Sequence, residues 1–141
     1  MIYVRESTGT IKAVTEKVKA EAVAYNFGVL DVRDLTEQMR NRQIDFPAHC
    51  LVIELADPAL SKECLQIGGA FLTLISPRIF VCWQGAKVSV SAQKLAPFIP
   101  IDASPDLRRQ AELTDRALQR IIDNSCAPIA RVDKVLDWNM S

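Results

Sequence analysis

The sequence has no long apolar run and no excess of charge of either sign. No stretch approaches the roughly 18 apolar residues that a membrane-spanning helix requires, so we expect no membrane anchor. The 17 basic and 17 acidic side chains cancel. Domains that bind nucleic acid neutralise phosphates with clustered Lys and Arg, whereas the pair Arg108-Arg109 is interleaved with acids. The composition therefore predicts a protein that binds neither membrane nor nucleic acid.

Histidine and closely spaced cysteines are also scarce. The single histidine is His49, and the four cysteines are Cys50, Cys64, Cys82 and Cys126. No two of them form a C-x-x-C pair, and their spacing fits neither a zinc ribbon nor a small disulfide scaffold. The first residues lack the basic segment and apolar core of a secretory signal. We therefore expect a cytoplasmic protein with reduced, mostly buried thiols, no metal site and no cofactor.

The motifs of common catalytic centres are absent as well. Gly68-Gly69-Ala70 lacks the Gly-Lys-Ser/Thr ending of a phosphate loop, and the chain holds no G-x-S-x-G, H-E-x-x-H or dinucleotide fingerprint. His49 and Cys50 are neighbours on an expected strand. Their side chains point to opposite faces and cannot serve each other as base and nucleophile. This pattern favours a protein without enzymatic activity.

Hydrophobic periodicity indicates an α+β fold. A length of 141 residues suits one domain with a real core. Apolar residues recur at helical spacing from Ile11 to Tyr25, and capping residues open further helices at Asp57-Pro58 and Ser104-Pro105. Two of the expected strands are joined by a tight turn at Gln84-Gly85-Ala86. We predict a mostly antiparallel sheet with helices packed on one face, plus a long C-terminal helix. The expected strands cover 2–5, 27–32, 50–55, 78–83 and 87–91, with further helices at 34–42 and within 101–126.

The strand from Cys50 to Leu55 carries one candidate binding residue. Alternate side chains point to opposite faces, and Glu54 lies on the face that is expected to be only partly buried. From there it faces Arg78 or Lys87 across the sheet, as an ion pair or as part of a pocket. Aromatic side chains on the following hairpin, Phe80 and Trp83, are predicted to lie in the core because no basic groove surrounds them.

Three motifs, in this order and spacing, give the chain a family resemblance. Asn26-Phe27-Gly28-Val29-Leu30 is similar to a Gly-Phe-x-Val-Leu motif, and Ala56-Asp57-Pro58 to a Cys-Asn-Pro motif that opens a helix. The stretch 76–83, Ser-Pro-Arg-Ile-Phe-Val-Cys-Trp, is similar to a Leu-Pro-Cys strand with a closing hairpin. Over about residues 1–95 the chain therefore resembles the family known as domain of unknown function 302 (DUF302). The resemblance implies a compact α+β domain, commonly self-associated, with no established reaction.

The chain also departs from the family pattern. The family cysteines would fall at Ala56 and Arg78, so no thiol or metal chemistry carries over to those positions. We predict a single domain, 1–141, with a family-like core at 1–100 and a long helix at 101–126 that looks like an addition to it. The remaining tail, 127–141, is apolar enough to dock on its own domain or on a partner subunit.

Three hypotheses for function remain open at this point. The first is a non-enzymatic, self-associating domain, most simply a homodimer because cyclic dimers are the commonest soluble oligomers. The second is a small-molecule-binding protein or enzyme with a pocket between sheet and helix, with Glu54, Arg78 and His49 at its mouth. The third is an adaptor for a larger complex, which predicts an exposed apolar patch.

Overall fold

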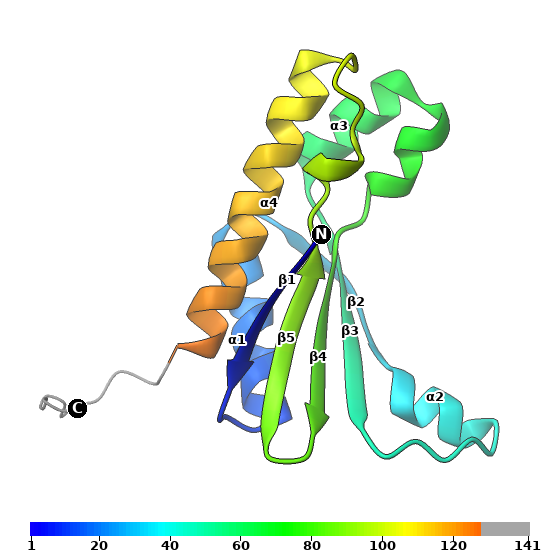
Figure 1. The fold of residues 1–141 in the computed structure, drawn as a ribbon, viewed down its shortest axis with the longest axis vertical. Helices are drawn as coiled ribbons and strands as arrows, with labels where there is room; N and C mark the ends of the chain where they lie inside the picture. Colours follow the sequence, from blue (N-terminus) through cyan, green and yellow to red (C-terminus); the bar gives the residue numbers. More distant parts are fainter. Residues whose placement is uncertain (128–141) are drawn as a thin grey trace, which may run out of the picture.

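The computed structural model describes residues 1–127 as one five-stranded sheet with helices (Figure 1). All neighbouring strands are antiparallel, in the order β1-β5-β4-β3-β2. The α+β class and the antiparallel sheet predicted from the sequence are confirmed. The elements are β1 (Ile2–Ser7), α1 (Ile11–Ala24), β2 (Gly28–Asp34), α2 (Leu35–Asn41), β3 (His49–Ala56), α3 (Pro58–Ile67), the 3₁₀ segment η1 (Gly69–Leu74), β4 (Arg78–Gln84), β5 (Lys87–Gln93), the 3₁₀ segment η2 (Ala96–Phe98) and α4 (Pro105–Cys126).

The predicted hairpin joins β4 to β5 through a two-residue turn. Gln84 pairs with Lys87, which leaves Gly85 and Ala86 at the tip. Gly85 has φ +85°, a conformation that side-chain-bearing residues rarely adopt, so a glycine is favoured at this position. The turn fixes the register of both strands, because a two-residue loop leaves no slack between them.

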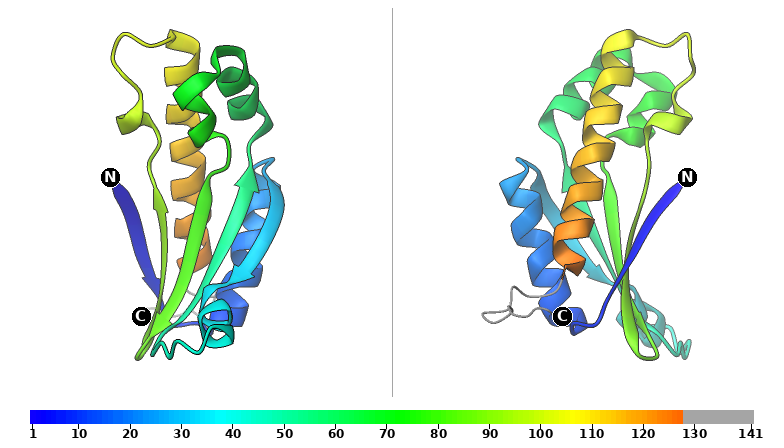
Figure 2. Two further views of the ribbon diagram at one scale, coloured as in Figure 1. Left: turned by 90° about the vertical axis from the view of Figure 1, so that its right-hand side faces the viewer. Right: turned by 60° about the vertical axis from the view of Figure 1, so that its left-hand side comes forward.

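Helices α1 and α4 pack against the same face of the sheet (Figure 2). Their apolar stripes meet the inward residues of the three central strands in one core cluster. On β3 and β5, Ile53, Leu55, Val88 and Val90 point into this cluster and are fully buried. The helical members of the cluster are Val14, Val18, Ala22, Leu118, Ile121, Ile122 and Cys126.

The first strand is tied to the last helix. Tyr3 Oη donates a hydrogen bond to Asp123 on α4. Arg5 Nη1 donates to the same carboxylate at 2.8 Å, and these contacts hold the pKa of Arg5 above its ordinary value through the Tyr3 hydroxyl and the Asp123 charge. Strand β1 pairs only with β5 in the sheet, so α4 supplies the second set of contacts that hold this edge.

A second apolar cluster lies beyond the end of the sheet, where α3, η2 and the first half of α4 meet. The carboxylate of Asp115 on α4 anchors it by accepting hydrogen bonds from the amides of Leu95 (2.7 Å) and Ala96 (2.9 Å). Burial raises the pKa of Asp115, and the two amides counter only part of that rise. This anchor fixes η2 above the end of β5.

The opposite face of the sheet is not covered by α1 or α4 (Figure 2). We call it the open face. Phe80 lies on it and is 37% exposed, and Trp83 near the hairpin tip is 43% exposed, so the prediction that both lie in the core was wrong. Phe80 is exposed because it points to the face that neither α1 nor α4 covers, whereas Trp83 lies next to the last residue of β4 before the turn. The open face comprises Ile2, Val4, Glu6, Asp31, Arg33, Cys50, Val52, Glu54, Arg78, Phe80, Cys82, Ser89, Ser91 and Gln93.

Two sequence predictions concern the C-terminal tail and membrane-spanning helices. The predicted docking of the tail concerns residues that, from 128 to 141, lie outside the described part of the chain. Among residues 1–127, none of the helices is both long and apolar enough to cross a bilayer.

Candidate ligand-binding site

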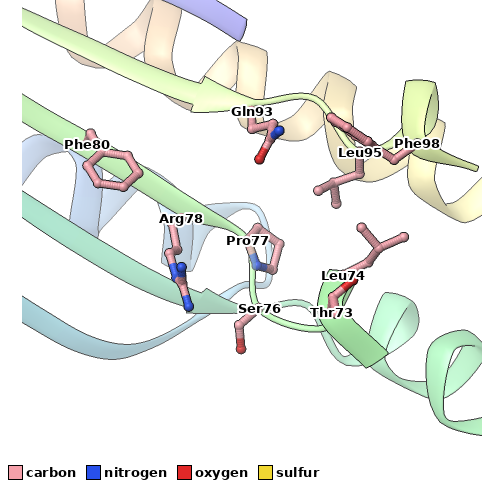
Figure 3. Close-up of a pocket in the computed structure, with 9 residues that line it drawn as sticks. All are labelled: Thr73, Leu74, Ser76, Pro77, Arg78, Phe80, Gln93, Leu95 and Phe98. Atoms are coloured by element: carbon pink, nitrogen blue, oxygen red, sulfur yellow. The ribbon is translucent and has the colours of Figure 1, made fainter. Parts of the chain in front are cut away.

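A pocket of about 420 Å³ opens at the end of the open face nearest α3. Its volume falls within the range of small-molecule sites, about 300–1,000 Å³. Figure 3 shows the lining side chains, which come from β4, β5, the two 3₁₀ segments and the connecting residues Ser76, Pro77 and Leu95. The apolar lining residues are Leu74, Pro77, Phe80, Leu95 and Phe98, and the polar ones are Thr73, Ser76, Arg78 and Gln93.

Local backbone features place these walls. Gly68 (φ +74°) and Gly69 (φ +59°) turn the chain out of α3 into η1, which carries Leu74 to the rim. The amide of Leu55 donates to the carbonyl of Pro77 at 2.8 Å, so pairing of β3 with β4 begins at the pocket floor. On the other side, the anchoring of η2 by the buried carboxylate on α4 sets the position of Phe98.

Arg78 is the only cationic side chain among the residues that line this pocket. Within residues 1–127, no carboxylate lies within ion-pair distance of it, and its guanidinium makes no hydrogen bond to this part of the chain. Glu54 is opposite Arg78 in register, but its carboxylate pairs with Arg33 instead, at 3.5 Å. Figure 3 shows the Arg78 side chain extending from β4 toward β3. An exposed guanidinium beside an apolar hollow suits a ligand that carries an anionic group.

His49 lies at the other end of β3, away from the pocket. Glu54 is five positions further along the strand, about 17 Å at 3.4 Å per residue, and alternation puts the two on opposite faces. His49 Nε2 lies 2.9 Å from Asp34 Oδ2. The structure therefore places Glu54 and Arg78 opposite each other on neighbouring strands, and His49 lies apart from both.

Asp34, the partner of His49, has a structural role at the start of α2. Its carboxylate caps α2 by accepting a hydrogen bond from the amide of Glu37 at 2.9 Å. Burial raises the pKa of Asp34, but the Glu37 amide and His49 outweigh it and hold that pKa below its ordinary value. The contact between Asp34 and His49 therefore joins β3 to the start of α2.

Sequence reasoning missed most of the pocket wall. Gln93 extends the alternation of β5 one step past Ser91, so the sequence did contain a signal for it. Arg33, the partner of Glu54, follows a register irregularity between Val29 and Asp31 that no pattern in the chain announces. Phe98 lies in a 3₁₀ segment of three residues, too short to have a readable period.

Two of the motifs quoted for the family resemblance meet at the far edge of the sheet. Gly28 of the first motif pairs with Ala56 of the second. Asn26 adopts a left-handed backbone with φ +67°, which ends the turn after α1. Asp57 is buried and caps α3, accepting from the amides of Ala59 (3.2 Å) and Leu60 (3.5 Å). The two motifs thus lie together at one corner of the structure.

The family model described as "Domain of unknown function DUF302" matches residues 3–125. The chain belongs to the DUF302 family. The match includes most of α4, so the long helix that was predicted to be an addition is part of the DUF302 domain. No curated protein matches the chain.

A solved structure supports the fold of this DUF302 domain. It is a crystal structure of an uncharacterised conserved DUF302 protein from Bacillus stearothermophilus, with a TM-score of 0.80 and 17% sequence identity. The similarity covers 89% of this chain and 98% of that one. At this identity the likeness shows the shared fold alone. Among residues 1–127, no group of three or more His, Cys, Asp or Glu side chains is arranged to hold a metal ion.

Proposed function

We propose that this DUF302 domain binds a small organic anion in the pocket at the end of the open face. The observation that supports it is the position of Arg78, a cation without a carboxylate partner among residues 1–127, at the edge of a hollow with apolar walls. A guanidinium presents a planar fork of donors that matches a carboxylate or phosphate. The apolar remainder of such a ligand would lie against Leu95 and Phe98.

The lining chemistry favours binding over turnover. The nucleophilic groups on the pocket wall are the hydroxyls of Thr73 and Ser76, and the lining includes no histidine, thiol or carboxylate to act as a base. Gln93 adds an amide that can donate and accept, which fixes the orientation of a polar group on the ligand. We also propose a cytoplasmic location, because a chain with four free cysteines suits a reducing compartment.

The test is a binding assay with a panel of aliphatic and aromatic carboxylates and phosphate monoesters. We expect at least one to bind, and Arg78→Gln to weaken its affinity at least about tenfold, because a hydrogen bond to a charged group contributes about 1.5–3 kcal/mol. Lys87→Gln is the matched control, since Lys87 is an exposed cation near the other end of β5. Equal affinities of the Arg78 and Lys87 variants, or no binding by any compound of the panel, would contradict the proposal.

A second candidate function is self-association through the open face. Its central row runs across the sheet as Val4, Ser91, Phe80 and Val52, and Val4 is 52% exposed. Val52 is already buried, so a second copy of the chain would cover the exposed Val4 and Phe80 side chains. It would use the same surface on both partners, as a two-fold dimer requires. The dimer would also enclose the pocket.

Sedimentation velocity tests this candidate directly. We expect a dimer for the unaltered chain and a monomer for Phe80→Asp, which places a charge in the apolar row. Val23→Asp is the control, because Val23 is 62% exposed on α1, away from the open face. A monomeric unaltered chain, or a dimer that survives Phe80→Asp but not Val23→Asp, would refute this use of the open face.

A further inference from the structure

Two of the four cysteines lie directly opposite each other on the open face. Cys50 of β3 and Cys82 of β4 are register partners, so their side chains leave the sheet on the same side. The register between these strands is continuous from His49↔Trp83 to Glu54↔Arg78. Both side chains are partly exposed, whereas Cys64 and Cys126 are buried.

The hydrogen-bond pattern shows which kind of cross-strand pair this is. In an antiparallel ladder, opposed residues alternate between bonded pairs and closer, non-bonded pairs. The amide of Cys50 donates away from β4, to Thr36 Oγ1 at 2.9 Å. At the other end of the strands, the amide of Leu55 donates to the carbonyl of Pro77, so Leu55 belongs to a bonded pair. Bonded and non-bonded pairs alternate along β3, and Cys50 is five positions from Leu55, so Cys50 again falls in a non-bonded pair. Cys50 and Cys82 therefore form a non-bonded pair.

This type of pair has the spacing that a disulfide requires. Non-bonded antiparallel pairs have Cα atoms about 4.5 Å apart, and disulfides span Cα separations of about 4.4–6.8 Å. The surroundings of Cys50 also change its ionisation. Burial, together with the neighbouring Cys82 and the charge of Asp34, raises the pKa of Cys50 to about 12. The raised pKa makes Cys50 a poor first nucleophile, so we assign the first attack on an oxidant to Cys82.

We propose that Cys50 and Cys82 form a reversible dithiol–disulfide couple whose oxidant is a small disulfide. The Cys82 thiolate attacks one sulfur of the oxidant, forms a mixed disulfide and releases one thiolate. The Cys50 sulfur then loses its proton and attacks the Cys82 sulfur, which forms the bond between β3 and β4 and releases the second thiolate. The protein loses two protons and two electrons, and the oxidant becomes two thiols. Because the pair is partly exposed, the bond stays accessible to reductants.

This couple is independent of the proposed ligand site. Cys82 is four positions from Arg78 on β4, about 13 Å along the strand, and neither cysteine lines the pocket. Loss of ligand binding in Arg78→Gln would therefore leave the redox proposal intact, and a failed oxidation would leave the ligand proposal intact.

The experiment equilibrates the purified chain in glutathione buffers of increasing oxidation, blocks remaining thiols under denaturing conditions and measures the intact mass. We expect the number of blocked cysteines to fall from four to two, with no retained glutathione, and to return to four after dithiothreitol. Peptide mapping should place the bond between Cys50 and Cys82. Four blocked cysteines at every buffer composition, a bond to Cys64 or Cys126, or a bond between two chains would overturn the proposal.

Single-cysteine variants separate the two steps. Cys50→Ser should accumulate a glutathione adduct on Cys82, because the second attack is removed. Cys82→Ser should accumulate less, since the remaining thiol has a raised pKa. Cys64→Ala is the matched control and should oxidise like the unaltered chain. Similar adducts on all three variants would show that the opposed pair has no special reactivity.

Discussion

Asp57 is the position where one substitution should report on how α3 is joined to α4. Its carboxylate accepts from the amides of Ala59 and Leu60, and Thr114 Oγ1 on α4 donates to it at 2.5 Å. Asp57→Ala removes an N-cap, which costs about 1 kcal/mol. It also leaves a buried hydroxyl without its acceptor, about 1–2 kcal/mol more. We expect the free energy of unfolding to fall by about 2–3 kcal/mol.

A double-mutant cycle separates the two contributions. Thr114→Val keeps the volume of the side chain and removes the hydroxyl, so Asp57→Ala with Thr114→Val should cost about 1–2 kcal/mol less than the sum of the single changes. Urea unfolding followed by circular dichroism measures all four proteins, and Asp106→Ala, an exposed acid on α4, is the control. Additive effects, or a loss below about 1 kcal/mol for Asp57→Ala, would refute the reasoning.

Three further predictions concern stability. The pKa of Asp34 is lower in the folded chain than in the unfolded chain. This difference stabilises the fold above the unfolded pKa, and the stabilisation is lost as the pH falls through the folded pKa. The unaltered chain should therefore lose stability below about pH 4 more steeply than Asp34→Asn. Asp115→Asn should lower the unfolding free energy by about 1–3 kcal/mol, because its amide group would face the Leu95 or Ala96 amide; urea titration beside Glu112→Gln checks this. Gly85→Val should lower the melting temperature, since φ +85° is strained for valine, while Ala86→Ser should not; equal melting curves would contradict it.

The helices could be predicted from the sequence because the residues that cap their N-termini are local sequence signals. Thr10, Asp57 and Ser104 each accept a hydrogen bond from the first turn of the helix that they precede. The hairpin was readable for the same reason, since Gly85 sits where the turn needs a positive φ. Side-chain alternation then predicted which face of β3 and β5 would be buried.

The strand order and the pocket could not be predicted from the sequence, because they depend on contacts between segments that are distant along the chain. Strands β2 and β1 form opposite edges, an arrangement that the local pattern does not encode. Of the two cations predicted to face Glu54, Arg78 and Lys87, Arg78 is its register partner. The irregularity in β2, however, brings Arg33 to the same carboxylate. The pocket wall includes η1 and η2, whose short 3₁₀ turns carry no hydrophobic period.

The pairing of β1 with β5 alone has a consequence for how the chain folds as it is synthesised. Ile2 pairs with Gln93, so about 90 residues must emerge before the first strand has its partner, and contacts of such long range slow folding. Its second set of contacts, through Asp123, comes later still. We therefore expect β1 to join the sheet after the strands nearer the middle of the chain have paired.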